Sequence, residues 1–493
     1  MKMLKEQKTD TFLKHKTIAS IVTPLGEGGI GKVIVSGPNA LSIVNEMFEG
    51  KGIADLREAA SHKLYYGHIT DKGQRIDEVI LNVMKRGDSF TGEDVVEVNC
   101  HGGIRVLMRI YECLQSAGAE GVGWDSLLLQ SFENDKMDFI QKEALQEVIK
   151  ARTKLGVKVL LDQYAGALSK AARQGLEIIE RIKRSLNYKN VKVHPHPSPP
   201  PSRERESDDL PQHISASPGG RGAGGKDQLH KNGASVSALT ERIKQLLETA
   251  PFGIALTSPQ VLVILGKPNV GKSTLINAIL GEERMLVHHE PGTTRDYVSE
   301  FISVDGVPFE LVDTAGVRNT SDMLESMSIE MTQEQLRRAD KVIVVFDNSR
   351  PFDHEDESIL SVLNSWVKTE NADDLRRKMN AHAIIPVINK RDLPAKLDRR
   401  RIESDVGQPL CYISAKNREG LEDLNSRLVQ EFDTAYKPMK PILFNKRQYL
   451  LLAKADVLVK REANCLTTEN VSNKTFQVID ELKDIFTACL MGS

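Results

Sequence analysis

The stretch VLVILGKPNVGKSTLIN, residues 261–277, decides the fold. Five apolar residues lead into GKPNVGKS, which fits the pattern G-x-x-x-x-G-K-[ST] with Gly266 as its first glycine. A strand before this pattern and a helix after it distinguish a phosphate-binding loop from a chance glycine-rich turn, and both are predicted here. Glycines let backbone amides approach phosphate oxygens, and the start of the helix adds a positive field. The expected nucleotide contacts in this loop are Asn269, Val270, Gly271, Lys272, Ser273 and Thr274.

Two later motifs predict which base is bound. NKRD, residues 389–392, follows an apolar strand, and the Asp392 carboxylate can accept hydrogen bonds from both N1–H and the 2-amino group of guanine. Adenine lacks that amino group and would leave a buried polar group unmatched, which is the strong form of discrimination. SAK, residues 414–416, also ends a strand and would support the same base. The predicted base contacts are Asn389, Lys390, Asp392, Ser414, Ala415 and Lys416.

Two motifs in between predict contacts to the γ-phosphate and to Mg²⁺. DTAG, residues 313–316, supplies a carboxylate near Mg²⁺, while PGTTRD, residues 291–296, supplies Thr294 as a Mg²⁺ hydroxyl beside that of Ser273. The order of the five motifs predicts an enzyme that hydrolyses GTP to GDP and phosphate, with a P-loop ATPase as the runner-up. The remaining expected GTP contacts are His288, Gly292, Thr293, Thr294, Asp313, Thr314, Ala315 and Gly316.

The group that orients the attacking water is not in its usual place. Ras-like GTPases carry a glutamine directly after DTAG, whereas this chain carries Val317, which cannot orient water. Glu325 is the candidate catalytic residue, and the alternative is a solvated glutamate on a helix face. The side-chain oxygen of Asn269 could ligate a monovalent cation that stabilises the developing charge. The alternative is a turn residue without a ligand.

Composition divides the chain into several domains. Residues 17–22, 32–37 and 94–100 are predicted to form strands, and residues 39–48 and 104–118 helices, which together indicate a small α+β domain. Strands alternate with helices further along, which predicts a Ras-like P-loop G domain with a doubly wound, mainly parallel sheet. The fold class is therefore multidomain, α+β and α/β, with the G domain inserted in a helical domain. The expected boundaries are an N-terminal extension (1–15), the α+β domain (16–130), the first helical half (131–190), an insert (191–235), a helical continuation (236–257), the G domain (258–435) and the second helical half (436–493).

Residues 193–233 differ sharply from their surroundings. They hold seven of the twenty prolines and almost no large apolar residue. Such a segment cannot bury enough surface to offset its chain entropy, so we expect disorder.

Bulk composition excludes several classes. The 66 basic and 68 acidic side chains nearly balance, which argues against a protein that coats nucleic acid or membrane non-specifically. The five cysteines form no CxxC pair, as is usual in a reducing cytosol. The lysine-rich start is not followed by the apolar core of a signal peptide, and no long apolar run predicts a transmembrane helix. We expect a cytoplasmic protein without a membrane partner.

Taken together, the nucleotide motifs and the segments that flank the G domain resemble the tRNA-modifying GTPase family called MnmE or TrmE. Outside the G domain the resemblance is carried by residues 17–38 (TIASIVTPLGEGGIGKVIVSGP), 89–103 (SFTGEDVVEVNCHGG) and 132–153 (FENDKMDFIQKEALQEVIKART). It covers most of the chain beyond the first 16 residues and the proline-rich insert. An Era-like ribosome-assembly GTPase would match in the G domain alone.

The resemblance implies partners and site roles. Family members dimerise through the N-terminal domain, which binds a formyl-tetrahydrofolate, and their G domains associate when GTP and K⁺ are bound. With the flavoprotein MnmG they modify carbon 5 of the wobble uridine, position 34 of certain tRNAs. For this chain the resemblance implies a homodimer, a catalytic role for Glu325, K⁺ contacts from Asn269, His288, Glu290 and Thr293, and folate contacts from Glu97 and Lys136.

Several residues depart from the family pattern. Ile34 takes the place of a folate-binding arginine, GWDSL (123–127) replaces a PGEF stretch, and the tail reads ACLMGS instead of ending in cysteine–x–glycine–lysine. Isoleucine cannot pair with an anionic folate. These departures leave open an alternative, a divergent paralogue that acts as a dimeric GTP switch without folate-dependent modification.

Overall fold

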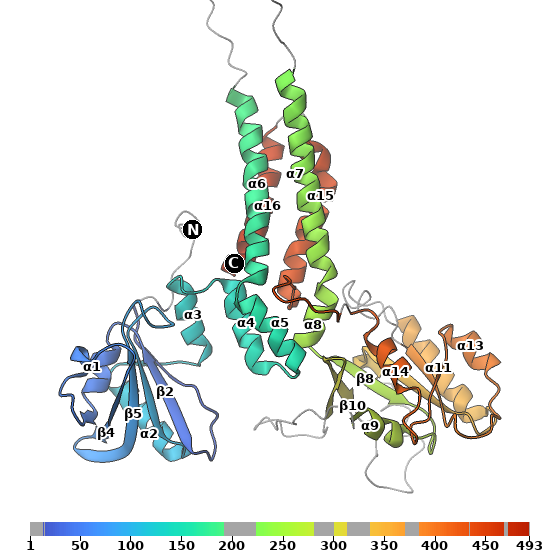
Figure 1. Cartoon of the computed structure of the whole chain (residues 1–493), viewed down its shortest axis with the longest axis horizontal. Helices are drawn as coiled ribbons and strands as arrows, with labels where there is room; N and C mark the ends of the chain where they lie inside the picture. The colour runs from blue at the N-terminus through green and yellow to red at the C-terminus, as the bar shows by residue number, and fades with distance from the viewer. Residues whose placement is uncertain are drawn as a thin grey trace, which may run out of the picture. The chain divides into compact units, whose positions relative to one another are not determined.

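Two units make up the computed structural model of the chain, which describes residues 13, 15–191, 223–280, 300–312, 336–369, 384–432, 434–467 and 472–492 (Figure 1). One unit comprises residues 1–146 with residues 490–493, and the other comprises residues 147–489. Within the described ranges, no helix is both long enough and apolar enough to span a bilayer.

The first unit is built on a seven-stranded sheet with the order β3-β4-β5-β6-β2-β1-β7. Neighbouring strands are antiparallel, except that β1 and β7 are parallel. The strands are β1 (Ile18–Ile21), β2 (Ile30–Ser36), β3 (Phe48–Gly50), β4 (Lys63–Asp71), β5 (Gln74–Met84), β6 (Val95–His101) and β7 (Glu120–Gly121). The helical elements are α1 (Ala40–Asn45), η2 (Leu56–Glu58), α2 (Ile104–Ser116) and α3 (Asp125–Glu133). Helix α4 (Phe139–Lys150) starts in this unit, and its last four residues belong to the second.

One face of this sheet carries the main core of the unit. Val33 and Val98 lie in one buried cluster with Leu107 and Ile110 of α2. The alternation of apolar residues along β2 and β6 places one side chain in two on this face. The predicted α+β character is confirmed, with β1, β2, β6 and α2 at the expected positions. The antiparallel hairpin of β4 and β5 was not predicted from the sequence.

Helices dominate the second unit outside its sheet. They are α5 (Lys154–Tyr164), α6 (Ala167–Val191), α7 (Ala223–Glu248), α8 (Ala250–Thr257), α15 (Lys446–Thr467) and α16 (Asn473–Met491). Figure 1 shows α6, α7, α15 and α16 side by side as an elongated bundle. Ion pairs join α6 to α16, through Lys183 with Asp480 and Glu180 with Lys483. Segments on both sides of the G domain in sequence thus pack together.

Helix α7 starts earlier than the sequence predicts. Residues 223–234 belong to it, although the sequence predicts disorder over residues 193–233 and a helical continuation only from residue 236. Once a helix is anchored, each further residue adds a hydrogen bond. The buried Leu239 and Ile243 anchor α7, so the helix extends into its polar flank. Residues 192–222 of the predicted insert lie outside the described residues.

The sheet of the second unit has the order β13-β12-β11-β8-β10-β9. All neighbouring strands are parallel except the antiparallel pair β9 and β10. Its strands are β8 (Gln260–Leu265), β9 (Glu300–Val304), β10 (Val307–Val312), β11 (Lys341–Asp347), β12 (Ile384–Asn389) and β13 (Cys411–Tyr412). The helices around it include α9 (Lys272–Leu280), α11 (His354–Thr369), α13 (Arg400–Val406) and α14 (Leu421–Val429).

Helices cover both faces of this sheet. Leu262 and Ile264 of β8 share a buried cluster with residues of α9 and α14. Val263 and Leu265 point the other way, into a cluster with residues of α11 and α13. Burial on both faces explains the unbroken apolar run in β8 and confirms the predicted doubly wound, mainly parallel sheet. Ligands of such sheets bind beyond the carboxyl ends of the strands, which is where the phosphate loop and the NKRD and SAK motifs lie.

Candidate functional site

The loop between β8 and α9 carries the predicted phosphate contacts. Asn269 and Gly271 both have left-handed backbone conformations, with φ of 65° and 101°. Between them, Val270 is not left-handed. A turn in which right-handed and left-handed backbone conformations alternate aims successive amide groups to one side, which forms a concave anion site. The chain then enters α9 at Lys272, so the positive end of a helix adds to this site. The loop therefore fits a run of phosphate groups.

Lys272 folds back over this loop. Its Nζ donates to the carbonyl oxygens of Gly266 at 2.7 Å and Lys267 at 3.0 Å. Burial lowers the pKa of Lys272. A phosphate anion beside the ammonium group would favour its charged form again. Ser273 and Thr274 are exposed in the first turn of α9, where the hydroxyl of Ser273 fits the role of a Mg²⁺ ligand.

Asn389 joins the phosphate loop to the SAK loop. Its Nδ2 donates to the carbonyl oxygen of Val270 at 2.8 Å, and its Oδ1 accepts from the backbone amide of Ala415 at 3.0 Å. Asn389 is 3% exposed, so both ends of its amide are satisfied inside the protein. This buried amide brings three motifs of distant sequence into one site.

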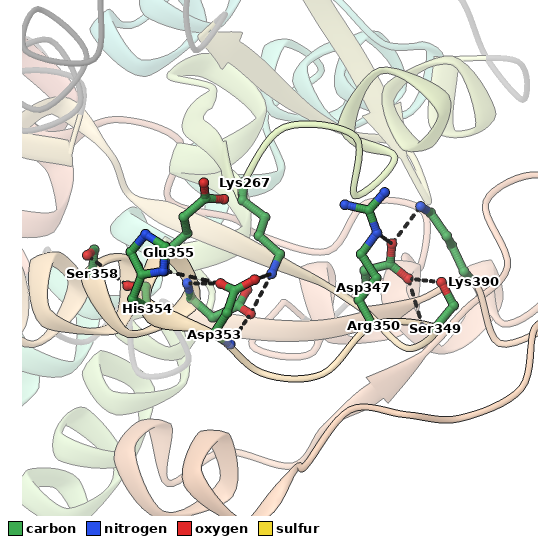
Figure 2. Close-up of polar contacts among 10 residues, drawn as sticks. Lys267, Asp347, Ser349, Arg350, Asp353, His354, Glu355, Ser358 and Lys390 are labelled. Atoms are coloured by element: carbon green, nitrogen blue, oxygen red, sulfur yellow. Dashed lines mark hydrogen bonds and ion pairs between the residues drawn. The ribbon is translucent and has the colours of Figure 1, made fainter.

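Lys390 forms a second bridge, which Figure 2 shows beside Asp347. Its Nζ donates to the carbonyl oxygen of Asn269 at 2.8 Å and to Oδ2 of Asp347 at 2.6 Å. Burial would raise the pKa of Asp347, but hydrogen bonds from Lys390 and Ser349 outweigh it and hold the pKa below its ordinary value. Asp347 was not among the predicted site residues. The one available signal was an aspartate closing the apolar run KVIVVFD.

Asp392 is held from the SAK loop. Its Oδ1 accepts from the hydroxyl of Ser414 at 2.6 Å, and Ser414 itself is fully buried. Asp392 is exposed, as is Lys416 at the end of the SAK motif. One carboxylate oxygen is thus fixed by the protein while the residue faces solvent. This arrangement fits a carboxylate that meets two adjacent donors on a planar base.

Part of the predicted site lies outside the described residues. The structure brings together the phosphate loop, the NKRD motif and the SAK motif. It gives no position for the predicted switch and catalytic residues His288, Glu290, Gly292, Thr293, Thr294, Asp313, Thr314, Ala315, Gly316 and Glu325.

The two predicted folate contacts lie in the first unit. Oε2 of Glu97 accepts from Lys32 Nζ at 3.0 Å and from Asn82 Nδ2 at 3.3 Å. Lys136 Nζ donates to the carbonyl oxygen of Gly87.

Ile34 lies opposite Glu97 in the sheet register. It is 7% exposed and belongs to an apolar cluster with Met84, Val95 and Leu127. The Ile34 side chain itself offers no charged or hydrogen-bonding group to a ligand there.

Comparison with known proteins covers most of the chain. Residues 17–123 match the family model "GTP-binding protein TrmE N-terminus", and residues 261–390 match "50S ribosome-binding GTPase". The "tRNA modification GTPase MnmE" of Alkaliphilus metalliredigens is 34% identical over 84% of this chain and 81% of its own length. The protein of the same name from Clostridioides difficile is 35% identical over 84% of this chain and 81% of its own.

A solved structure of the G domain of the T. maritima FeoB iron transporter matches 35% of this chain and 98% of its own, at 25% identity and a TM-score of 0.25. A GTPase family model matches the segment that carries the phosphate loop and the Asn389 motif, and both relatives are named GTPases, so the chain is a GTP hydrolase. With such identity across more than four fifths of its relatives, the chain belongs to the tRNA modification GTPase MnmE family.

Proposed function

We propose that this GTPase takes part in modification of carbon 5 of the wobble uridine of tRNA, together with an MnmG-like flavoprotein and as a homodimer. The observation that carries the proposal is the extent of the similarity. It includes residues 17–123 as well as the G domain, and the relatives that share this arrangement are named tRNA modification GTPases. This extent also favours a modifying enzyme over a GTP switch that has lost the reaction.

The residues of this chain would divide the work as follows. The amides of the phosphate loop bind the phosphates, Lys272 reaches their oxygens, and Asp392 orients guanine. Ser273 and Thr294 would hold Mg²⁺, which supplies positive charge to the phosphate oxygens when bound. Glu97 and Lys136 would hold the folate donor, and Ile34 would add no charged contact to it.

A monovalent cation site built around Asn269 is part of the proposal. Asn269 is exposed and sits in the left-handed turn of the phosphate loop, so its amide oxygen is free to face the nucleotide side. His288, Glu290 and Thr293 would complete a K⁺ site. A cation there would stabilise negative charge that develops on the transferred phosphoryl group.

A comparison of potassium and sodium salts tests this function. We expect GTP hydrolysis at equal ionic strength to be about tenfold faster in KCl than in NaCl, because the fixed cation stabilises the transition state. Wobble uridine modification should follow the same salt dependence when tRNA, the folate donor and the MnmG-like protein are added, read out by mass spectrometry of nucleosides. Asn269→Ala should lose the K⁺ advantage, whereas Asn277→Ala, an exposed asparagine of α9, should keep it.

Two outcomes would count against this proposal. Equal hydrolysis rates in KCl and NaCl would remove the cation site. Fast hydrolysis in KCl with unmodified tRNA would instead identify a GTP switch.

Glu325 is the proposed water-orienting residue. Replacing Glu325 with alanine is expected to slow single-turnover hydrolysis by about 100-fold, the usual scale for a lost general base. GTP affinity should change little, because the residue acts on water and not on the bound nucleotide. A matching loss of affinity would show that Glu325 has a structural role.

A further inference from the structure

Lys267, the second residue of the GKPNVGKS pattern, is buried in a way that lysine rarely is. Its side chain is 5% exposed, and its Nζ donates to Oδ2 of Asp353 at 2.6 Å (Figure 2). The same Nζ donates to Oδ2 of Asp356 at 2.8 Å. The Asp356 side chain is 1% exposed. Buried charges are tolerated when they are paired and hydrogen-bonded. The three side chains therefore hold one another in place.

Both carboxylates belong to the start of α11. Oδ1 of Asp353 accepts from the amides of Glu355 and Asp356, and Oδ2 of Asp356 accepts from the amide of Asp353 at 3.2 Å. This reciprocal pattern is a capping box. The positive end of the helix would repel a lysine, and the two carboxylates offset that repulsion. Lys267 is thus tied to a helix start whose own geometry is fixed.

Hydrogen bonds connect Lys267 to the rest of the phosphate loop. The carbonyl oxygen of Lys267 accepts from Nζ of Lys272, which also contacts the carbonyl oxygen of Gly266. On the other side of the loop, Lys390 joins the carbonyl oxygen of Asn269 to Asp347. The segment from Asp347 to Asp356 therefore holds the phosphate loop at two points, through one lysine at each.

We propose that Lys267 is a positioning residue for GTP, which fixes the first half of the phosphate loop against the capping box of α11. Without this anchor the Gly266–Lys267 peptide, on which Lys272 rests, is free to shift. Misplacement of about 1 Å at an active site can cost 100-fold in rate. The anchor acts through the loop, so Lys267 itself need not touch the nucleotide.

The test compares variants of the full chain. Lys267→Met keeps the apolar stem but removes the charge, and we expect GTP affinity to fall about tenfold, or ~1.4 kcal/mol at 25 °C. The double variant Lys267→Met with Asp356→Asn removes the uncompensated buried carboxylate as well. It should regain thermal stability but not GTP affinity. Lys267→Arg keeps a charged donor, so it should retain most of the thermal stability and most of the GTP affinity that Lys267→Met loses.

A matched control separates positioning from general stability. Lys341 forms another buried ion pair in the same unit, with Glu431, at side-chain exposures of 0% and 8%. Lys341→Met should lower the melting temperature while folded protein keeps its GTP affinity. Dissociation constants for GTP and GDP are measured by fluorescence at a temperature where each variant is folded, and kcat and KM by phosphate release.

Three results would overturn the proposal. The first is native GTP affinity and kcat in the Lys267→Met, Asp356→Asn double variant. The second is an equal loss of affinity in Lys341→Met. If Lys267→Met does not fold, Asp353→Asn takes its place, because that carboxylate is 45% exposed. About threefold weaker GTP binding by Asp353→Asn at an unchanged melting temperature supports the anchor, on the scale of the net contribution of one ordinary hydrogen bond. Unchanged binding contradicts it.

Discussion

Replacing Asp392 with asparagine is expected to weaken GTP binding by about 100-fold or more, because a carboxylate that accepts two hydrogen bonds from guanine becomes an amide. The amide offers one acceptor and one donor, so its NH₂ group would face the 2-amino group of guanine. Xanthine carries a carbonyl oxygen at that position and would accept from the amide. Affinity for XTP should therefore rise as affinity for GTP falls. Calorimetric titration of wild type and Asp392→Asn with GTP and XTP measures both changes.

A nearby aspartate provides the control for this substitution. Asp398 is exposed on the segment after β12 and accepts from the backbone amide of Arg400. Asp398→Asn changes the same charge and should leave both affinities unchanged. If Asp392→Asn weakens GTP and XTP alike, the residue supports the loop and does not read the base.

Gly271→Ala is expected to reduce GTP binding by more than about 100-fold, because it combines a disfavoured backbone conformation with a displaced amide that orders the loop. The backbone at Gly271 has a φ of 101°, and an added Cβ would lie 2.3 Å from Nδ2 of Asn389. Asn389 would have to move, and its hydrogen bonds to Val270 and Ala415 would break. The phosphate loop and the SAK loop would then lose the hydrogen bonds through Asn389 that connect them. Fluorescent GTP titration and a thermal melt measure the effect.

Gly407→Ala is the control that separates the backbone cost of the substitution from the steric clash. Its φ is 63°, at the end of α13, and an added Cβ would meet no atom within 4 Å. Gly407→Ala carries the backbone cost without the clash, so it should lower stability by about 1–2 kcal/mol and leave GTP affinity intact. Native GTP binding by Gly271→Ala would contradict the tight fit between the glycine and Asn389.

The phosphate loop and the sheet around it were predictable because their signals are local. A strand, a glycine pattern and a helix within residues 261–277 fix the local geometry, and the apolar run of β8 indicates burial on both faces. The early start of α7 at Ala223 could not be predicted in this way. It depends on helix propagation from buried residues further along the chain.

The ties that hold the site were not predictable, since they join residues far apart in sequence. Lys267 meets Asp353 and Asp356 across 86 and 89 positions, and Asn389 meets the carbonyl oxygen of Val270 across 119. Neither lysine nor aspartate in a loop signals burial by its residue type, because both are usually exposed. Their pairing follows from which strands are neighbours in the sheet. The roles of Glu325 and of the K⁺ contacts remain predictions, because those residues, Asn269 excepted, lie outside the described ranges.

Recognition of guanine by the NKRD and SAK loops, above a phosphate loop that holds the triphosphate, is the central claim. Calorimetric titration of the unaltered chain with non-hydrolysable analogues of GTP and of ATP, in the same Mg²⁺ and K⁺ buffer, tests it most directly. Saturable binding of GTP at one site per chain, with no measurable heat of binding from ATP, is the predicted result. Equal or tighter binding of ATP would contradict it.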